Sequence, residues 1–466
     1  MRRTALFSAV LLLVAAVTLI SKDPQTDARL KNASRAQERG GWIQVHLQGT
    51  PNEIGFQHGY LLANEIKDNF TALSTEMIHE EKKDWNFFRK TAEEVFWPHV
   101  EQEYRDELLG IVEGVKARGV KLDLWDIVSL NAWLEQPYYD KWWDKRHGGK
   151  PSNAGLPERC SAFVATGSYT KDGRPVIAHN NWTSYSSGER WNIVFDIAPA
   201  KGYRFIMDGA PGLIHSGDDF GVNSAGIAIT ETTISDFNSF TPDGIPEFVR
   251  ARKAMQYSAS IDDYARIMKE GNTGGYANNW LIADRKNNEV ASLELGLQHV
   301  TLLRTKDGFF VGSNFPANPE LIKDETSFDP NNKGLSANAR HARWLTLMEQ
   351  NKGRIDVAAG EKFLADHVDT FSGKTEPSER TLCGHIDLSP RGAPGWVGPF
   401  APVGAVQNKI TDAAGMEKLS FSADLGHACG MNFKASEHLS KHPEYAWWQP
   451  ILKDMDSRGW TKFVAK

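Results

Sequence analysis

Apolar residues between Asn52 and about Glu135 recur every three or four positions, the spacing of helices that bury one face. A short strand-like run at residues 42–50 precedes them. The repeat is clearest in two series, which are Ile66, Phe70, Leu73 and Met77, and then Phe96, Val100, Tyr104, Leu108, Ile111 and Val115. A third helix is predicted to begin at Leu124. Residues 41–159 are therefore predicted to be mainly α-helical.

The pattern changes after residue 160, where short apolar runs separated by turn residues predict strands. These runs are 160–166, 174–181, 190–198, 202–208, 226–232, 279–284, 289–295, 299–303 and 308–312. Helical spacing interrupts them at 246–258, 261–269, 338–350 and 356–367. The Trp-rich tail, residues 444–466, is predicted to pack as a helix and a strand. Strands, then helices, then strands favour an α+β layered domain over residues 160–466 rather than alternating βαβ units.

Cys160 stands at the junction of a polar loop and a predicted strand. Residues 144–159 are rich in Gly, Pro and charged side chains, which predicts an exposed and cleavable loop. A thiol on the first residue of a strand after such a loop suggests a nucleophile that chain cleavage would unmask. The alternative is a buried structural cysteine, which is the commoner fate of a single thiol.

The N-terminus has the pattern of an export signal. Arg2 and Arg3 precede an apolar run at residues 5–20. We therefore predict a signal peptide or an uncleaved signal anchor over residues 1–22, although the run is short for a membrane span. The alternative is a helix that packs on the fold. The signal pattern predicts that the protein is exported. Residues 23–40 are polar and are predicted to form a loose tether.

The chain has three cysteines, and an odd count in an exported protein leaves one thiol over. Cys383 and Cys429 are each close in sequence to a histidine, in Cys383-Gly384-His385 and His427-Ala428-Cys429. We favour a disulfide between these two cysteines, which would leave Cys160 free. Free thiols are the second alternative. A metal site is the third, because C-x-H is not a usual ligand spacing.

Composition and missing motifs narrow the functional classes. The 466 residues carry a net charge of −6 with both signs mixed along the chain, so no basic stripe indicates nucleic-acid binding. The sequence has no G-x-S-x-G, no P-loop, no H-E-x-x-H and no G-x-G-x-x-G between a strand and a helix. These absences argue against the common serine hydrolases, NTPases, zincins and Rossmann enzymes.

Polar residues gather where predicted strands begin or end. The hairpin that opens with the candidate thiol ends in His179, which either terminates the strand or returns toward that thiol. Asp218 and Asp219 lie between glycines, where they close a turn or present a carboxylate. Asn279 begins a strand, where it donates to an oxyanion or only closes the turn. Arg391, in a Pro- and Gly-rich loop, is either solvated or orients a carboxylate or phosphate.

In combination these motifs resemble the phospholipase B-like family over roughly residues 40–430, and more distantly the penicillin acyltransferase and acid ceramidase group. All of them are N-terminal nucleophile hydrolases. The matching motifs are Cys160-Ser161-Ala162, His179-Asn180-Asn181-Trp182-Thr183-Ser184-Tyr185, Ser216-Gly217-Asp218-Asp219-Phe220, Gly226 through Glu231-Thr232-Thr233, Tyr276-Ala277-Asn278-Asn279-Trp280, and Gly404-Ala405-Val406 with Lys409. The opening Gly49-Thr50-Pro51 and Gly55-Phe56-Gln57-His58-Gly59 are similar to the acyltransferase group.

The resemblance implies an αββα sandwich and self-cleavage of the Arg159–Cys160 bond. It makes Cys160 the nucleophile and its new α-amine the base, because an α-amine titrates at roughly 7.7–8.0 and accepts a thiol proton near neutrality. We assign Asn279 to the oxyanion, with Asn278 as the alternative. The candidate orienting groups are Asp218, Asp219 and Arg391.

His179 and Trp182 stand where ceramidase-type relatives place Arg and Asp. The sequence follows the phospholipase B-like pattern instead, which argues against ceramidase or bile-salt specificity. The expected reaction is hydrolysis of an acyl ester or amide through a thioester on Cys160. The alternatives are acyl transfer to an amine and an inert exported binding protein of the same fold. We expect a small-molecule or lipid acyl substrate, a membrane surface for a lipid, no nucleic acid, and no metal or cofactor.

Overall fold

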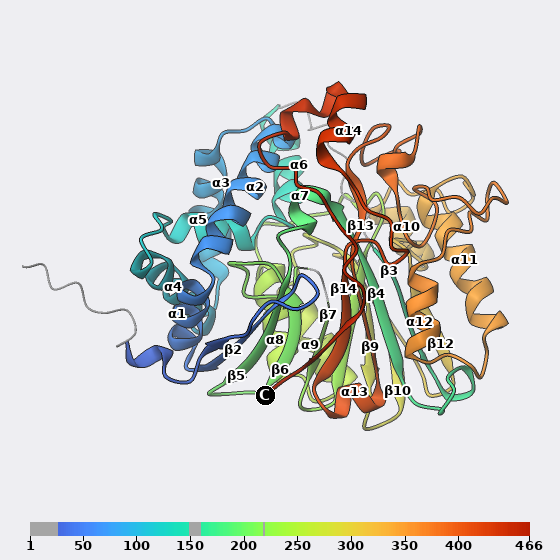
Figure 1. Ribbon diagram of the computed structural model, residues 1–466, viewed down its shortest axis with the longest axis horizontal. Helices are drawn as coiled ribbons and strands as arrows, with labels where there is room; N and C mark the ends of the chain where they lie inside the picture. Colours follow the sequence, from blue (N-terminus) through green and yellow to red (C-terminus); the bar gives the residue numbers. More distant parts are fainter. Residues whose placement is uncertain (1–26, 149–159, 218–219) are drawn as a thin grey trace, which may run out of the picture.

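The structure, a computed structural model, describes residues 27–148, 160–217 and 220–466. Within these residues the chain forms two β-sheets with helices packed on them (Figure 1). This arrangement confirms the prediction of a protein that mixes α and β structure. The predicted signal segment, residues 1–22, and the first four residues of the predicted tether, 23–26, lie outside the described part of the chain.

The two sheets differ in size. In the described residues the larger sheet has nine strands, in the order β1 (Ser34–Arg35), β2 (Ile43–Gly49), β5 (Ile193–Pro199), β6 (Phe205–Gly209), β7 (Phe220–Asn223), β8 (Ile227–Thr233), β9 (Asn278–Asp284), β10 (Glu289–Leu295) and β11 (Val300–Thr305). The smaller sheet has six, in the order β12 (Gly308–Gly312), β3 (Ser161–Thr166), β4 (Val176–Ser184), β13 (Val403–Asp412), β14 (Ser420–Leu425) and β15 (Thr461–Val464).

Helices flank both sheets. The first group is α1 (Pro51–Leu61), α2 (Ala63–Glu81), α3 (Trp85–Thr91), α4 (Gln102–Ala117), α5 (Leu124–Asn131) and α6 (Gln136–His147). The later helices are α7 (Tyr185–Gly188), α8 (Glu247–Tyr257), α9 (Ile261–Lys269), α10 (Pro319–Glu325), α11 (Ser336–Gln350), α12 (Val357–Leu364), α13 (Ala413–Glu417) and α14 (Ala435–Lys441). The second predicted helical series is interrupted around Pro98, which lacks a backbone N–H, so α3 and α4 are separate. None of the described helices is both long and apolar enough to cross a membrane.

The N-terminal part of the chain belongs to the larger sheet. β2 runs parallel to β5, with Ile43 opposite Ile193, and β1 pairs with the other edge of β2. Arg29 bonds to the side chains of Asp27 and Asn52. The prediction of a loose tether is therefore wrong for residues 27–40, because strand pairing and these side-chain bonds fix them on the fold.

Helices α1 and α4 pack with their backbones almost in contact. A Cβ atom added at Gly55 would lie 1.9 Å from the carbonyl oxygen of Glu107, and one at Gly114 would lie 2.4 Å from that of Phe56. Only glycine leaves room for this approach. The close pair holds the start of α1 against the sheet that carries β2.

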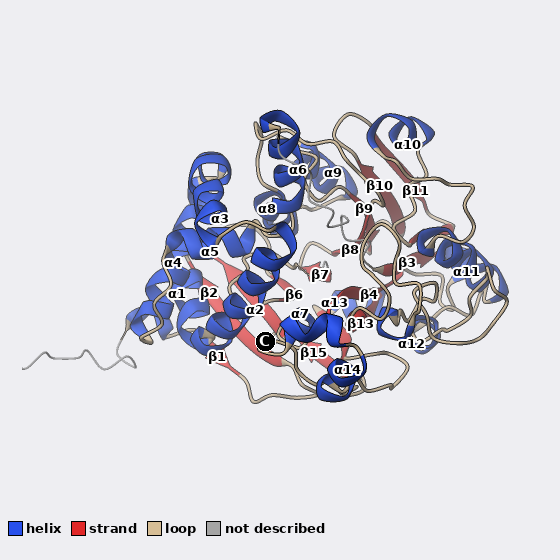
Figure 2. Ribbon diagram, turned by 90° about the horizontal axis from the view of Figure 1, so that it is seen from above, coloured by secondary structure: helices blue, strands red, loops and turns tan. Residues whose placement is uncertain are grey.

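Of the four hydrophobic cores in the described residues, three pack the sheets against each other or against helices. The core between the two sheets includes Ala162, Ile177, Val194, Ile206, Phe220, Ala228 and Leu281. A second core joins the larger sheet to α1–α6, α8 and α9 and includes Val45, Leu108, Ile127, Ile229, Tyr264 and Ile282. A third joins the smaller sheet to α11 and α12 and includes Phe163, Ala178, Trp344 and Phe363. Figure 2 shows α1–α5 on the left of the molecule and α11 and α12 on the right.

The nine predicted strands after residue 160 all occur, within a few residues of their expected ends. The four predicted helices and the helix-and-strand tail occur as well, as α8, α9, α11, α12, a 3-10 helix at Pro443–Trp448 and β15. The sequence pattern missed β7, β13 and β14. The predicted boundary at residue 160 divides the strands of the larger sheet, because β1 and β2 lie before it and the other strands lie after it.

Candidate active site

Cys160 lies immediately before β3, the second strand of the smaller sheet. The residue is 1% exposed and its backbone has a φ of +85°. Side chains with a Cβ rarely adopt this left-handed region, and residues held there cluster at functional sites. Arg159, the other residue of the predicted cleavage site, lies outside the described residues.

The Cys160 thiol faces acceptor groups from both sheets. Its Sγ is 3.5 Å from Oδ1 of Asn181 on β4 and 4.0 Å from Oε1 of Glu231 on β8. The hydroxyl of Tyr276 donates to the same Glu231 oxygen across 2.9 Å. The site is thus assembled where the smaller sheet meets the end of β8.

His179 returns to Cys160 as the hairpin pattern predicts. It pairs with Ala162 in the register of β3 and β4, and its ring, the Cys160 thiol and the Glu231 carboxylate have ligand atoms within 4.8 Å of one another. Burial, and then the charge of nearby Lys409, hold the pKa of His179 well below its ordinary value. The imidazole is therefore neutral.

Lys409 forms a buried ion pair that crosses between the sheets. Its Nζ is 2.6 Å from Oδ2 of Asp208 on β6, and both side chains are fully buried. Ser216 donates to the other Asp208 oxygen across 2.9 Å. The predicted candidates Asp218 and Asp219 follow this serine and lie outside the described residues.

Arg340 on α11 holds the backbone of Cys160. Its guanidinium donates to the carbonyl oxygen of Cys160 across 2.6 Å and to Oδ1 of Asn314 across 2.7 Å. The ring of Trp182 supports the guanidinium from one side, with 4.4 Å between Cζ and the ring centroid. Trp182 is therefore placed behind Arg340, as a support for it.

The two candidate oxyanion donors occupy opposite faces of β9. Glu231 pairs with Trp280, two residues from Asn278, so Asn278 and Glu231 point to the same face. Asn278 is fully buried, and neither polar atom of its side chain has a hydrogen-bond partner in the described part of the chain. Its geometry therefore supports the alternative donor.

Asn279 points to the other face. Its Oδ1 accepts a hydrogen bond from Ser292 across 2.6 Å. It lines a cavity of about 250 Å³ with Ser292, Glu294, Thr301, Leu303, Ala317, Asn318 and Pro319. The lining residues belong to β9, β10, β11 and the segment that leads into α10, and they include none of the side chains described above around the Cys160 thiol.

Arg391 lies in a half-exposed loop. Its guanidinium is 3.4 Å from the carbonyl oxygen of Gly334 and 3.5 Å from a carboxylate oxygen of Glu379. Neither group touches Cys160. The structure therefore does not bring Arg391 to the nucleophile, because its loop closes on the end of α11 instead.

The predicted disulfide is not formed, since Cys383 and Cys429 are both thiols in the described structure. Each of them lies 3.5 Å from Nε2 of His385, so both sulfurs face a shared imidazole nitrogen, and the two thiols are also hydrogen-bonded to each other. The odd-count argument that singled out Cys160 therefore loses its premise. Its position before β3 still distinguishes it.

The sequence pattern did not assign Arg340, Asn314 or Tyr276 to the site. Arg340 has the ordinary spacing of a helix residue, and nothing in the sequence separates it from a surface arginine. Glu231 carried a signal, because a carboxylate at the end of an apolar strand is unusual.

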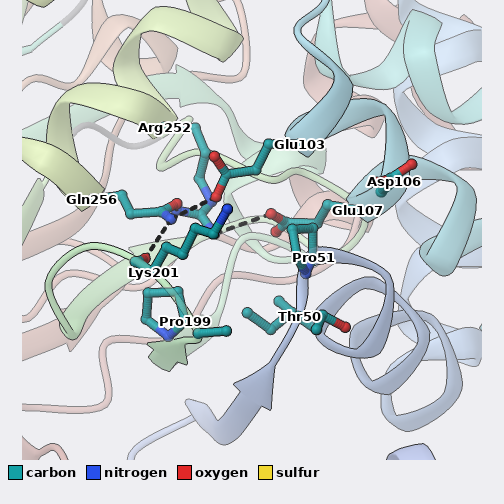
Figure 3. Close-up of a pocket in the computed structure, with 11 residues that line it drawn as sticks. Thr50, Pro51, Glu103, Asp106, Glu107, Pro199, Lys201, Arg252 and Gln256 are labelled. Atoms are coloured by element: carbon teal, nitrogen blue, oxygen red, sulfur yellow. Dashed lines mark hydrogen bonds and ion pairs between the residues drawn. The ribbon is translucent and has the colours of Figure 1, made fainter.

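A larger cavity of about 410 Å³ lies elsewhere, between α1, α4, α8 and the turn after β5 (Figure 3). Four of its polar side chains, those of Glu103, Glu107, Arg252 and Gln256, are paired with one another. Arg252 is 3.0 Å from Glu107, and Gln256 donates to Glu103 and to the carbonyl of Lys201, each across 2.8 Å. None of the residues that line it touches Cys160 in the described structure.

Comparison with known proteins places the chain in a family. The family model for Phospholipase B matches residues 46–359, which include Cys160, Glu231 and Arg340. The chain belongs to the phospholipase B family. This membership confirms the resemblance that the sequence motifs indicate.

Individual relatives of this family member are distant. An uncharacterized protein of Archaeoglobus fulgidus is 26% identical over 53% of this chain and 42% of its own length. Phospholipase B-like 1 of Bos taurus is 24% identical over 54% and 52%, respectively. An acyl-coenzyme A:6-aminopenicillanic-acid acyltransferase, 40 kDa form, of Emericella nidulans is 25% identical over 49% and 57%. The alignments thus span about half the length of these relatives.

Among solved structures, a mutant of the conjugated bile acid hydrolase from Clostridium perfringens aligns with a TM-score of 0.32 at 10% identity. The alignment covers 57% of this chain and 89% of that protein.

Proposed function

We propose that the protein is a self-processing N-terminal nucleophile hydrolase of the αββα type. Cys160 would first cleave its own peptide bond to Arg159 and then cleave an acyl ester or amide. The observation that carries the proposal is the setting of Cys160, a buried thiol before a strand with positive φ and acceptor oxygens from both sheets. Helices packed outside both sheets support the fold assignment.

The processing step is an N-to-S acyl shift followed by hydrolysis. Sγ of Cys160 attacks the carbonyl carbon of Arg159 while its proton passes to a base. The C–N bond then breaks, the α-amine of Cys160 takes up a proton, and a thioester replaces the amide. Water hydrolyses the thioester, which frees the thiol and leaves a carboxylate on Arg159. The positive φ supports this step, because scission releases the constraint on a strained backbone.

Two different bases serve the two stages. Before cleavage the nitrogen of Cys160 is an amide and cannot accept the thiol proton. The Glu231 carboxylate, 4.0 Å from Sγ, is placed to accept it in the precursor. After cleavage the free α-amine takes over this role, since its ordinary pKa of roughly 7.7–8.0 suits a base near neutrality. The Tyr276 hydroxyl orients the carboxylate.

During turnover the thiolate attacks the acyl carbon of the substrate, the leaving alcohol or amine takes a proton, and water hydrolyses the thioester. The tetrahedral intermediate needs a hydrogen-bond donor, and the carboxamide of Asn278 or Asn279 would supply it. The buried and unbonded carboxamide of Asn278 favours that residue.

The substrate class follows from the chemistry and the family. A thioester enzyme of the phospholipase B family would act on an acyl ester or amide, with phospholipids and N-acyl compounds as the two candidates. Export, with contact at a membrane surface for a lipid substrate, belongs to the same proposal. Transfer to an amine is the second candidate function, because a relative is named as an acyltransferase. Product analysis with and without an amine acceptor separates the two.

Gel electrophoresis and N-terminal sequencing of the purified protein test the proposal. We expect two polypeptides, the larger beginning Cys-Ser-Ala-Phe-Val, and an intact chain for Cys160→Ala. A wild-type protein that stays in one piece at mildly acidic and neutral pH would overturn self-processing. If Cys160→Ala still splits before residue 160, an external protease makes the cut.

A further inference from the structure

Four side chains outside the nucleophile site converge on one point. His367, Cys383, His385 and Cys429 each offer a ligand atom, and all four atoms lie within 4.8 Å of one another. They come from the segment after α12, the segment before the 3-10 helix Ile386–Leu388, and the turn after β14. The proposed reaction does not use this cluster, and its four residues lie outside the range that the family model matches.

The distances in the cluster match a tetrahedral metal site. Nε2 of His385 is 3.5 Å from Sγ of Cys383 and 3.5 Å from Sγ of Cys429. Zinc bonds of about 2.3 Å to sulfur and 2.0–2.1 Å to nitrogen, at tetrahedral angles, place those ligand atoms about 3.6 Å apart. A hydrogen bond to one sulfur does not explain the equal approach to both.

The backbone around the cluster is held in place independently of any ion. Nδ2 of Asn180 on β4 donates to the carbonyl oxygens of Leu364 and Leu382, across 3.1 and 3.0 Å. The N–H of Cys383 donates to the carbonyl of Asp366 across 3.1 Å. The two segments that carry His367 and Cys383 are thus preorganised for a shared ligand.

We propose that His367, Cys383, His385 and Cys429 bind one zinc ion in a structural site. Two thiolates and two imidazoles are a closed, four-ligand set that zinc favours, and they leave no position for a substrate. Cys383 and His385 are buried, whereas His367 and Cys429 are partly exposed, so an ion can enter from that side. The C-x-H spacing is unusual for a metal site when it is considered alone. The structure completes the ligand set with His367 and Cys429, which come from distant segments of the chain.

The site would stiffen the wall behind the nucleophile. Gly384 lies between two of the ligands, and a Cβ added there would be 2.1 Å from the ring of Trp182. The same ring also contacts the guanidinium of Arg340, which donates a hydrogen bond to the carbonyl of Cys160. An ion that fixes residues 383–385 therefore also fixes the position of Trp182.

Metal analysis of the full-length protein tests the site. The protein is purified with a reductant, incubated with zinc sulfate, desalted, and measured by atomic emission. We expect one zinc ion per chain in the wild type and in Cys160→Ala, which excludes binding at the nucleophile. Cys429→Ser, at the partly exposed ligand, should lose most of the zinc. Wild type without stoichiometric zinc, or Cys429→Ser with undiminished zinc, would overturn the proposal.

A second measurement needs no variant. Wild type loaded with Co²⁺ should show thiolate-to-cobalt charge transfer and the intense d–d bands of tetrahedral cobalt. The weak spectrum of octahedral cobalt would contradict the site. Thiol titration of the unfolded protein without reductant checks the competing disulfide, because oxidation of Cys383 and Cys429 leaves one of the three thiols reactive. A single reactive thiol in freshly purified protein would replace the metal site with a disulfide.

Discussion

Arg340 donates a hydrogen bond to the main-chain carbonyl of Cys160 across 2.6 Å, although 180 positions separate the two residues. The guanidinium is fully buried and also bonds to Asn314 and Ser336. It therefore links α11 to Cys160, the residue that immediately precedes β3. A buried cation with several partners is costly to disturb, because each partner loses its bond at once.

Arg340→Met should impair both stability and processing. The unpaired carbonyl and carboxamide left behind should lower the free energy of unfolding by about 3 kcal/mol. The fraction of cleaved chain, measured on gels over time, should fall with it. Arg391→Ala is the control, since that side chain is half-exposed and should change either quantity little. Equal effects of the two variants would contradict the placement of Arg340.

Asn278→Ala and Asn279→Ala separate the two oxyanion candidates. Loss of the true donor should reduce kcat by about 10²–10³. We expect the larger loss in Asn278→Ala, because Asn278 on β9 and Glu231 on β8 lie on the same face of the larger sheet. The measurement uses fully processed protein, so that a folding or cleavage defect does not enter. A large loss confined to Asn279→Ala would restore Asn279 as the donor, and normal turnover in both variants would reject both.

Glu231→Gln should slow self-cleavage by about 10²–10⁴, because a carboxamide cannot take the thiol proton in the precursor. Tyr276→Phe keeps the carboxylate and removes only the hydroxyl that orients it, so its effect should be smaller. Time courses of chain cleavage after expression of the precursor give both rates. A Glu231→Gln precursor that cleaves as fast as the wild type would exclude the carboxylate as the first base.

His58 should make the fold sensitive to acid. Burial lowers the pKa of His58 from 6.5 to about 3, and its neutral Nε2 accepts the N–H of Gly212. The folded state therefore binds the proton less readily than the unfolded state. The stabilisation is present above pH 6.5 and is lost progressively as pH falls toward 3, by about 2 kcal/mol between pH 7 and pH 5.

His58→Gln tests this dependence, because glutamine keeps an acceptor near the position of Nε2 but does not titrate. Between pH 7 and pH 5 the free energy of unfolding of the variant should fall by about 2 kcal/mol less than that of the wild type. Parallel pH profiles for the two proteins would mean that His58 is not a source of the acid sensitivity.

The sequence pattern predicted the local features well and the distant contacts poorly. The hairpin of β3 and β4 was predictable, because one turn sets the register that brings His179 to Cys160. β13 was missed because its buried Gln407, Asn408 and Lys409 look like loop residues, and only the partners on neighbouring strands explain their burial. Arg340 and the Cys383–Cys429 cluster depend on tertiary contacts that no local spacing encodes.

Strand β2 determines what the mature molecule would be. It lies within the larger sheet, parallel to β5, yet it precedes the proposed cut before Cys160. Once that bond is broken, neither polypeptide would hold the complete larger sheet, so the product would be an obligate heterodimer formed from a single precursor. Refolding would then become a bimolecular process that depends on concentration, whereas the precursor folds as one chain. The proposed cleavage would thereby make folding a one-way event, and the lifetime of the mature protein would rest on slow unfolding rather than on reversible stability.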